Sequence, residues 1–331
     1  MKRRDFMKLS AGLGAAAALQ PLSGASAQAK SVFKASDVQP PGYPTVAATE
    51  NLGKKLEAAT QGRLSIQMFP SMQLGGEKET IEQTQIGAVQ MVRVSVGAMG
   101  PIVDDINVVN MPFLFKNTAH AEKMMDGPIG QELLDKITAS PNAGLVGLCW
   151  MDSGARSLYN TKRPIKAIED LHGLKFRVIG NPIFVDMMNA LGGNGVAMGY
   201  DQVFSALQTG VIDGAENNPP SYVFSNHYTA AKYYSLTEHL IIPEVLLFSK
   251  KAWTSLSSDD QGLIKKFARE AQLEEREFWQ KYEQQAMEKA KAAGCEITEI
   301  PDKTPFQNAV KPVWDKYGPK YQDMIKRIQA I

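Results

Sequence analysis

The 331-residue sequence predicts an α/β protein of two lobes, with one long helix near the C-terminus. Apolar strand-like runs alternate with amphipathic helical runs, which is typical of βαβ units and mostly parallel sheets. The alternation occurs in two series that meet near residues 151–160, and an apolar run at 240–249 leads the chain back. We therefore expect a cleft between the lobes and strands that cross at a hinge.

The first series supplies the elements of the first lobe. Its first helix is indicated by apolar residues at helical spacing from Val46 to Ala59 and by Gly62 in the C-cap position. Strands are indicated by alternating or continuous apolar residues between turn residues. Around that helix, we expect strands at 31–36, 64–68, 89–96 and 145–150, and helices at 77–86 and 119–137.

The second series begins near residue 153 and repeats this alternation. The glycine-rich run at 192–195 follows a helix rather than a strand, so we interpret it as a helix C-cap and turn instead of a phosphate-binding loop. After a turn at 170–173, we expect strands at 174–179 and 211–213, helices at 182–191 and 200–209, and the returning strand at 240–249.

The last third of the sequence predicts one long helix over 257–294. Ser257 is a suitable N-cap, Asp259 and Asp260 lie in the first turn, and Gly262 is the only glycine before Gly294. A coiled coil is the alternative, but the aromatic residues do not keep a strict heptad. We expect this helix to brace both lobes.

The first 27 residues have the order of a cleavable secretory signal. Basic residues including Arg3 and Arg4 precede a mildly apolar run at 9–19, and small residues lead to a cleavage site after Ala27. The Arg3-Arg4 pair resembles a twin-arginine signal. A membrane anchor is disfavoured, because a spanning helix needs roughly 20 apolar residues. We expect a periplasmic protein.

The formal charge of +1 falls to about −2 once this basic segment is removed, so no excess of positive charge favours nucleic acid or an anionic membrane. Cys149 and Cys295 could form one disulfide, although two free thiols are the favoured interpretation. The expected divisions are a signal peptide at 1–27, a first lobe at 28–152 with roughly 241–256, a second lobe at 153–240 with a contribution from the tail, the long helix at 257–294 and a packing segment at 295–331.

Sequence motifs of catalysis are missing. None of the four histidines belongs to an H-E-x-x-H pattern, and neither G-x-S-x-G nor G-x-x-x-x-G-K-[ST] occurs. We therefore expect no catalytic residues, no cofactor and no metal.

Two arginines lie where a carboxylate could bind. Arg177 is near the carboxyl end of the strand at 174–179, and Arg156 follows the strand at 145–150. Ligands of open α/β sheets bind outside the carboxyl ends of the strands, and a guanidinium grips a carboxylate through two parallel hydrogen bonds. A surface salt bridge is the alternative for either residue.

Polar residues gather in the loops around these arginines. Glu216, Asn217 and Asn218 follow the short strand at 211–213, where they can form a ligand site, a turn or both. Glu77, which follows the loop containing Gln73, can bind a ligand or satisfy a helix N-terminus.

Six segments together resemble the solute-binding proteins of tripartite ATP-independent periplasmic (TRAP) transporters, the DctP type. They occur in the family's order across the chain after the signal: Gln73-Leu74-Gly75, Gly87-Ala88-Val89-Gln90-Met91, Met111-Pro112-Phe113-Leu114-Phe115, Gly173-Leu174-Lys175-Phe176-Arg177-Val178, Ala206-Leu207-Gln208-Thr209-Gly210 and Val211-Ile212-Asp213-Gly214-Ala215-Glu216-Asn217.

The resemblance implies a two-lobed periplasmic binding protein fold that closes on its ligand and delivers it to TRAP membrane permease subunits. It implies that Arg177 pairs with the ligand carboxylate, and that Arg156 and Asn217 also contact the ligand. Members that bind 2-oxo acids often have Trp beside the glutamate, and some hold a metal there. Here that position is Asn217, so no metal is expected.

The loops resemble those of members that bind hexuronates or related sugar acids. Hydroxyl groups need donors and acceptors, which Glu77, Asn181, Glu216, Asn217 and Asn218 supply. Gln73 belongs to the same set, and Tyr222 and Trp150 could cover a sugar face, with core packing the favoured role for Trp150. The alternatives are a C4-dicarboxylate or other organic-acid binder and a periplasmic sugar-acid lyase. We expect the protein to be a monomer.

Overall fold

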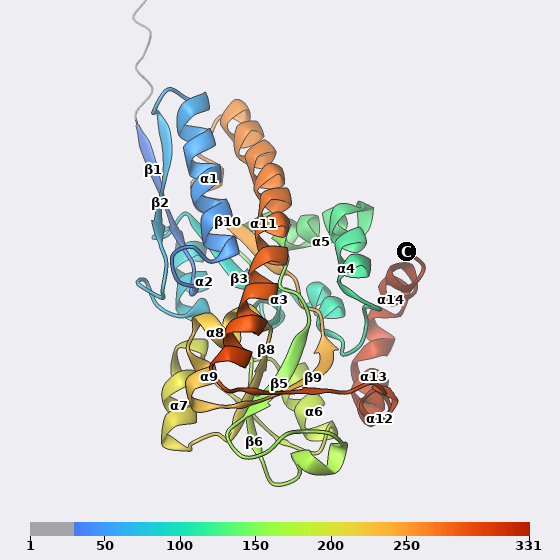
Figure 1. The fold of residues 1–331 in the computed structure, drawn as a ribbon. Helices are drawn as coiled ribbons and strands as arrows, with labels where there is room; N and C mark the ends of the chain where they lie inside the picture. Colours follow the sequence, from blue (N-terminus) through green and yellow to red (C-terminus); the bar gives the residue numbers. More distant parts are fainter. Residues whose placement is uncertain (1–29) are drawn as a thin grey trace, which may run out of the picture.

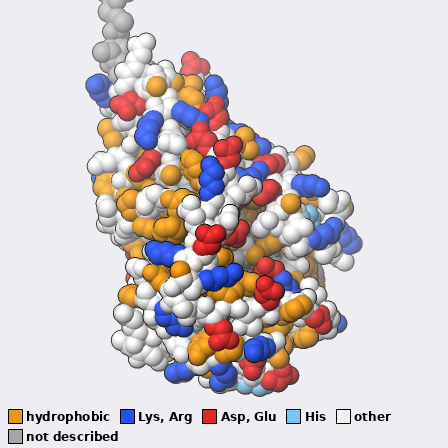
Figure 2. Space-filling view, viewed as in Figure 1, with side chains coloured by type: hydrophobic (Ala, Val, Ile, Leu, Met, Phe, Trp, Pro, Cys, Tyr) orange, Lys and Arg blue, Asp and Glu red, His pale blue; other side chains and the backbone are white. Residues whose placement is uncertain are grey.

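The computed structural model describes residues 30–331, so the expected signal peptide and its cleavage site lie outside the described residues. Figure 1 shows two α/β parts, one above the other in this view, with α11 running from the upper part to the lower. On the face in Figure 2, acidic and basic side chains are interspersed. This arrangement confirms the predicted two-lobed α/β class.

The first sheet has five strands in the order β2-β1-β3-β10-β4. Strand β1 pairs in parallel with β2 and β3, whereas β10 is antiparallel to β3 and β4. Strand β10 therefore returns to the first lobe late in the sequence. The bounds are β1 Ser31–Ser36, β2 Leu64–Phe69, β3 Met91–Ser95, β4 Leu145–Met151 and β10 Glu244–Ser249.

The second sheet has six strands in the order β11-β9-β5-β8-β6-β7. Strand β6 is parallel to β7 and β8, β5 is antiparallel to β8 and β9, and β11 adds the tail in parallel to β9. The bounds are β5 Arg156–Asn160, β6 Lys175–Val178, β7 Asn194–Ala197, β8 Gly214–Asn217, β9 Tyr233–Leu240 and β11 Glu296–Glu299.

Helices cover these sheets. In the first lobe they are α1 Pro44–Ala59, α2 Glu77–Ile86, α3 Val96–Met99, η1 Asp104–Asn110, α4 Thr118–Asp126, α5 Pro128–Ala139 and α10 Lys250–Trp253. In the second they are η2 Ile168–Leu171, α6 Pro182–Ala190, η3 Tyr200–Gln202, α7 Val203–Thr209, α8 Pro219–Phe224 and α9 His227–Ala230. The tail adds α12 Thr304–Ala309, α13 Lys311–Tyr317, η4 Gly318–Tyr321 and α14 Gln322–Gln329.

The predicted long helix is confirmed as α11, Ser258–Ala292, with the Ser257 side chain accepting from the Asp260 amide. Its first half packs through Ile264 and Phe267 into the core of the first lobe, and Ala286 and Ala290 pack into that of the second. In the middle, the Glu275 carboxylate accepts from the Asp152 amide at 2.7 Å, where the chain leaves β4. The helix therefore supports both lobes and the crossing between them.

Several predicted boundaries are wrong. The helix expected at 119–137 is two helices, because Gly127 and Pro128 interrupt it and proline donates no backbone hydrogen bond. The strand expected at 211–213 instead begins at Gly214, where β8 finds partners on both sides. The strand expected at 240–249 is interrupted at 241–243, and β10 begins only at Glu244. The run at 192–195, expected to be a helix C-cap and turn, also contains the start of strand β7 at Asn194.

Both cysteines are free and buried, so the disulfide alternative is wrong. Within residues 30–331, no helix is long and apolar enough to cross a membrane. The division into residues 28–152 with 241–256 and residues 153–240 stays a proposal.

Candidate functional site

A small cavity lies between the two sheets. It is formed where β1, β3, β6 and β8 end and the antiparallel β10 begins, so strand ends from both lobes meet there. A larger hollow adjoins it and shares Glu77, Arg177, Ile179 and Tyr200. The cavity is lined by Val38, Gln39, Glu77, Arg93, Ser95, Arg156, Arg177, Ile179, Tyr200, Asn217, Ser221 and Glu244.

Arg177 is a buried cation that lacks a carboxylate partner among residues 30–331. It lies on β6, its Nε donates to the Met198 carbonyl at 2.9 Å, and its guanidinium carbon is 5.6 Å from the centre of the Tyr200 ring. Burial lowers the pKa of Arg177 from its ordinary value. An anion in the cavity would therefore act as the counterion that the Arg177 guanidinium lacks in the described part of the chain.

Arg156, in contrast, is fully engaged by β8. Its Nε donates to Glu216 Oε2 at 2.6 Å, and Nη1 donates to Asn217 Oδ1 at 2.8 Å. Burial alone would raise the pKa of Glu216, but the Arg156 charge lowers it to about 2. His239 Nε2 is 3.7 Å from Glu216 Oε2. Glu216 thus lies behind Arg156 as its counterion and does not line the cavity.

The first-lobe wall is acidic with one arginine. Arg93 on β3 donates to Asp37 Oδ2 at 2.9 Å and to Glu244 Oε2 at 2.8 Å. Glu77, at the first turn of α2, accepts from the Ser95 amide at 2.7 Å. Burial and the neighbouring Glu244 raise the pKa of Glu77 to about 7. This wall offers acceptors for hydroxyl groups and little uncompensated positive charge.

The other predicted site residues lie outside the cavity lining. Trp150 donates to the Gly130 carbonyl within the core, and Tyr222 OH donates to the Ala231 carbonyl. Gln73 is exposed before α2. Asn181 caps α6 and donates to the Gly97 carbonyl and Asn107 Oδ1 across the lobes, and Asn218 caps α8.

Replacing Asn218 with alanine is expected to lower the free energy of unfolding by about 1 kcal/mol. The substitution removes the α8 cap to the Ser221 amide and the hydrogen bond to Ser153 Oγ on the crossing segment. Urea unfolding measures the change, with Asn308→Ala on the tail as the control. An unchanged midpoint would show that the cap is dispensable.

Sequence reasoning missed eight residues of the lining: Val38, Gln39, Arg93, Ser95, Ile179, Tyr200, Ser221 and Glu244. Arg93 had a usable signal, because a charged residue within the apolar run Met91-Val92-Arg93-Val94 is unusual unless it is paired. Glu244 similarly opens an apolar strand. Gln39, Tyr200 and Ser221 carry no such signal.

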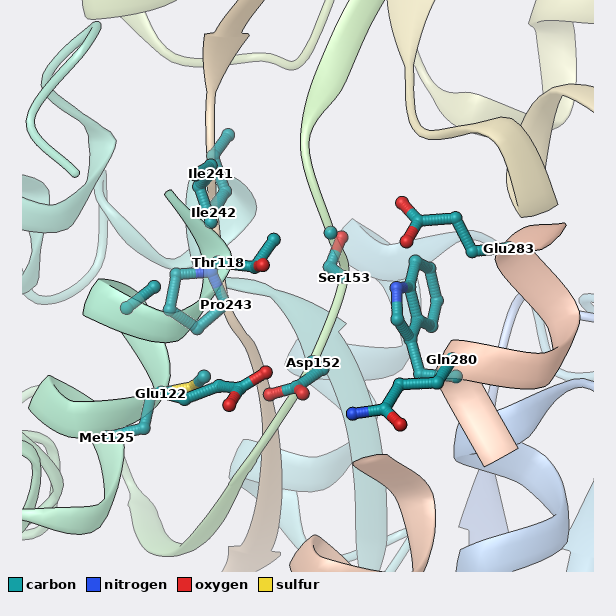
Figure 3. A pocket seen from close by; sticks show the side chains of 13 residues that line it. Thr118, Glu122, Met125, Asp152, Ser153, Ile241, Ile242, Pro243, Gln280 and Glu283 are labelled. Carbon is teal, nitrogen blue, oxygen red and sulfur yellow. The ribbon is translucent and has the colours of Figure 1, made fainter. Parts of the chain in front are cut away.

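A separate hollow lies where the chain crosses between the two sheets. Figure 3 shows Asp152 and Ser153 on one crossing segment facing Ile241 to Pro243 on the other. Among residues 30–331, no group of three or more histidine, cysteine, aspartate or glutamate residues could hold a metal ion.

Comparison with known proteins identifies two regions of the sequence. The family described as bacterial extracellular solute-binding protein, family 7 (DctP) matches residues 35–320. A signal sequence of the twin-arginine translocation pathway matches residues 1–19.

Solved structures of TRAP periplasmic solute-binding proteins share the fold. One from Pseudomonas putida F1 with bound D-glucuronate is 54% identical, covers 91% of this chain and 97% of its own, and has a TM-score of 0.89. One from a Bradyrhizobium species with galacturonate is 43% identical over 91% of this chain and 100% of its own, with a TM-score of 0.88.

A Citrobacter koseri protein is known in two states. With bound D-glucuronate it is 48% identical over 91% of this chain and 99% of its own, at a TM-score of 0.89. Its open structure without ligand gives a TM-score of 0.80, at 45% identity over 90% of this chain and 98% of its own. The lobes described here are therefore arranged more like the ligand-bound form.

Proposed function

Because the chain belongs to the DctP family of bacterial extracellular solute-binding proteins, we propose that its ligand is a hexuronate such as D-glucuronate or D-galacturonate. The protein is the periplasmic solute-binding component of a TRAP transporter, exported through a twin-arginine signal. It captures its ligand between the lobes and passes it to the membrane permease subunits. We take the monomer to be the form that does so.

The uncompensated charge of Arg177 is the observation that carries this proposal. A carboxylate in the cavity would give the guanidinium its missing counterion through two parallel hydrogen bonds. Asn217, on the neighbouring β8, also lines the cavity and can donate to the same group through its Nδ2. The second lobe thus supplies the donors for a single carboxylate.

The opposite wall supports a polyhydroxylated ligand. Glu77 and Glu244 present carboxyl oxygens that accept from hydroxyl groups, and Arg93 lies between them as a donor. A hexuronate has one carboxylate and several hydroxyls, which matches this division of donors and acceptors.

A sugar-acid lyase is the alternative from another class, since Glu77 could be imagined as a general base. Binding rather than catalysis is favoured by family membership, because the matching family is one of transport proteins. Incubation with D-glucuronate or D-galacturonate, followed by analysis for products, distinguishes the two functions. Formation of an unsaturated product would favour the lyase.

Thermal shift is the direct test of the proposed ligand. A hexuronate present at 100 times its dissociation constant should stabilise the native state by about 2.7 kcal/mol and raise the melting temperature. D-glucuronate, D-galacturonate, succinate and malate form the panel. If neither uronate raises the melting temperature, the result counts against the proposed ligand.

Ligand binding is expected to make the protein more compact in solution. Hinge closure around the ligand brings together lobes that otherwise stand apart, as periplasmic binding proteins do. Small-angle scattering with saturating D-glucuronate should give a smaller radius of gyration than scattering without it. Identical profiles, with binding confirmed by calorimetry on the same sample, would contradict closure.

Binding is also expected to take up a proton below about pH 7. Burial and the neighbouring Glu244 raise the pKa of Glu77 to about 7 in the arrangement described, and we expect its ordinary range when the lobes stand apart. This contribution to closure is then fully present below the ordinary range and is lost as the pH rises through 7. At about pH 6, uptake should approach roughly one proton, and at about pH 8.5 it should vanish. Calorimetry in buffers of different ionisation enthalpy measures it. Glu77→Gln should abolish the uptake; its persistence would assign the proton to another group.

A further inference from the structure

The two lobes contact each other directly at the edge of the cavity. Gln39 follows β1 in the first lobe, and its Nε2 donates to Oγ of Ser221 on α8 of the second lobe at 3.2 Å. The Tyr43 hydroxyl is 3.0 Å from the same Ser221 oxygen. All three side chains are buried. Because its partners belong to different lobes, we expect this contact to break when the lobes separate.

Each side of the contact is held in place by its own lobe. The backbone N–H of Gln39 donates to Asp37 Oδ1 at 2.8 Å, and Arg93 fixes Asp37 by donating to its carboxylate. The Ser221 amide donates to Asn218 Oδ1 at 2.8 Å in the α8 cap. The backbone at both residues is therefore held within its own lobe, which limits the ordering that their contact requires.

The side-chain oxygen of Gln39 lacks a hydrogen-bond donor within the described part of the chain. Gln39 Oε1 is buried and has no hydrogen-bond partner among residues 30–331, although Gln39 and Ser221 both line the cavity. A buried acceptor without a donor is unfavourable, so a donor supplied by the ligand would be stabilising. A carboxylate has no proton to donate at neutral pH, whereas a hydroxyl group does.

We propose that Gln39 is a specificity-determining residue that couples a ligand hydroxyl to lobe closure. Its Oε1 accepts from a hydroxyl of the bound ligand while its Nε2 donates to Ser221, so one amide joins the ligand and both lobes. This inference rests on the proposed function, because it requires a hydroxylated ligand. A ligand without a hydroxyl at this place leaves the Gln39 oxygen unpaired in the closed state.

A double-mutant cycle with D-glucuronate tests the coupling. Gln39→Met keeps the approximate shape and removes both polar ends, and Ser221→Ala removes only the partner in the second lobe. We expect affinity to fall roughly 10- to 100-fold in Gln39→Met and roughly 3- to 10-fold in Ser221→Ala. The double variant should lose less than the product of the two, because both changes break one contact. The losses should appear mainly as faster dissociation in stopped-flow measurements.

Gln67→Met on β2 is the matched control, because Gln67 is an exposed glutamine of the first lobe. It should bind like the wild type. Melting temperatures without ligand confirm that all variants are folded, and Gln39→Ala replaces Gln39→Met if the latter does not fold.

Wild-type affinity and dissociation rate in Ser221→Ala would overturn the coupling, and wild-type affinity in Gln39→Met would overturn the whole inference. A wild type that binds neither D-glucuronate nor D-galacturonate refutes the proposed ligand instead. If succinate or malate then binds, the Ser221→Ala comparison with that acid decides whether the contact between the lobes contributes to binding. Binding of succinate would also overturn the proposed hydroxyl contact, because succinate has no hydroxyl group.

Discussion

Arg177→Ala should weaken binding of D-glucuronate or D-galacturonate by about 2–5 kcal/mol, or roughly 30-fold to several thousand-fold in the dissociation constant. Arg177 has no carboxylate partner within residues 30–331, so the ligand carboxylate is expected to provide it. The variant would leave that carboxylate buried without its cation. Isothermal titration calorimetry measures the loss directly.

The free protein should tolerate this substitution. Removing Arg177 leaves no protein carboxylate unpaired, in contrast to removal of Arg156, which would strand the buried Glu216. The melting temperature of ligand-free Arg177→Ala is therefore expected to stay near that of the wild type or to rise.

Two further variants sharpen the assignment. Arg177→Lys keeps the charge but loses the two parallel hydrogen bonds, so its affinity should lie between those of the wild type and Arg177→Ala. Arg327→Ala, an exposed arginine paired with Glu132 on the surface, should bind normally. Unchanged affinity in folded Arg177→Ala would rule out Arg177 as the carboxylate anchor.

Hexuronates should bind more tightly than succinate or malate by several powers of ten. Discrimination of this size arises when the wrong ligand leaves buried polar groups unpaired. A second ligand carboxylate would meet Glu77 and Glu244 on the first-lobe wall, where Arg93 already pairs with Asp37 and Glu244. Titration with D-glucuronate, D-galacturonate, succinate and malate gives the four dissociation constants.

The structure changes the basis of this prediction. Glu216 was expected to face the ligand, but it pairs with Arg156, and Glu244 takes its place on the wall. Arg156 is accordingly not a free second cation for a dicarboxylate. The double variant Glu77→Gln with Glu244→Gln should reduce the difference in affinity between the hexuronates and succinate or malate, because it removes the two carboxylates of the first-lobe wall. Tight binding of succinate or malate with no response to either uronate would refute the hexuronate assignment and leave the transport role intact.

The sequence by itself determined the features that depend on neighbouring residues. The helix at 77–86 was predicted at its observed bounds, since Gly87 ends it with a left-handed backbone that glycine adopts without strain. Ser257 and the long proline-free stretch determined α11 in the same way. The position of Arg177 on the strand before α6 also followed from local alternation.

Only the tertiary structure decided which distant residues share the cavity. Gln39 and Ser221 are 182 positions apart, and Arg93 and Glu244 are 151 apart. These pairs depend on the order of strands in each sheet and on the approach of the lobes, which local periodicity does not encode. The same reason explains β8: its four residues lack a strong strand pattern, and they form a strand because β5 and β6 offer hydrogen bonds on both sides. Strand pairing thereby turned Glu216 toward Arg156 and left Asn217 at the cavity, a choice that depends on contacts made across the fold.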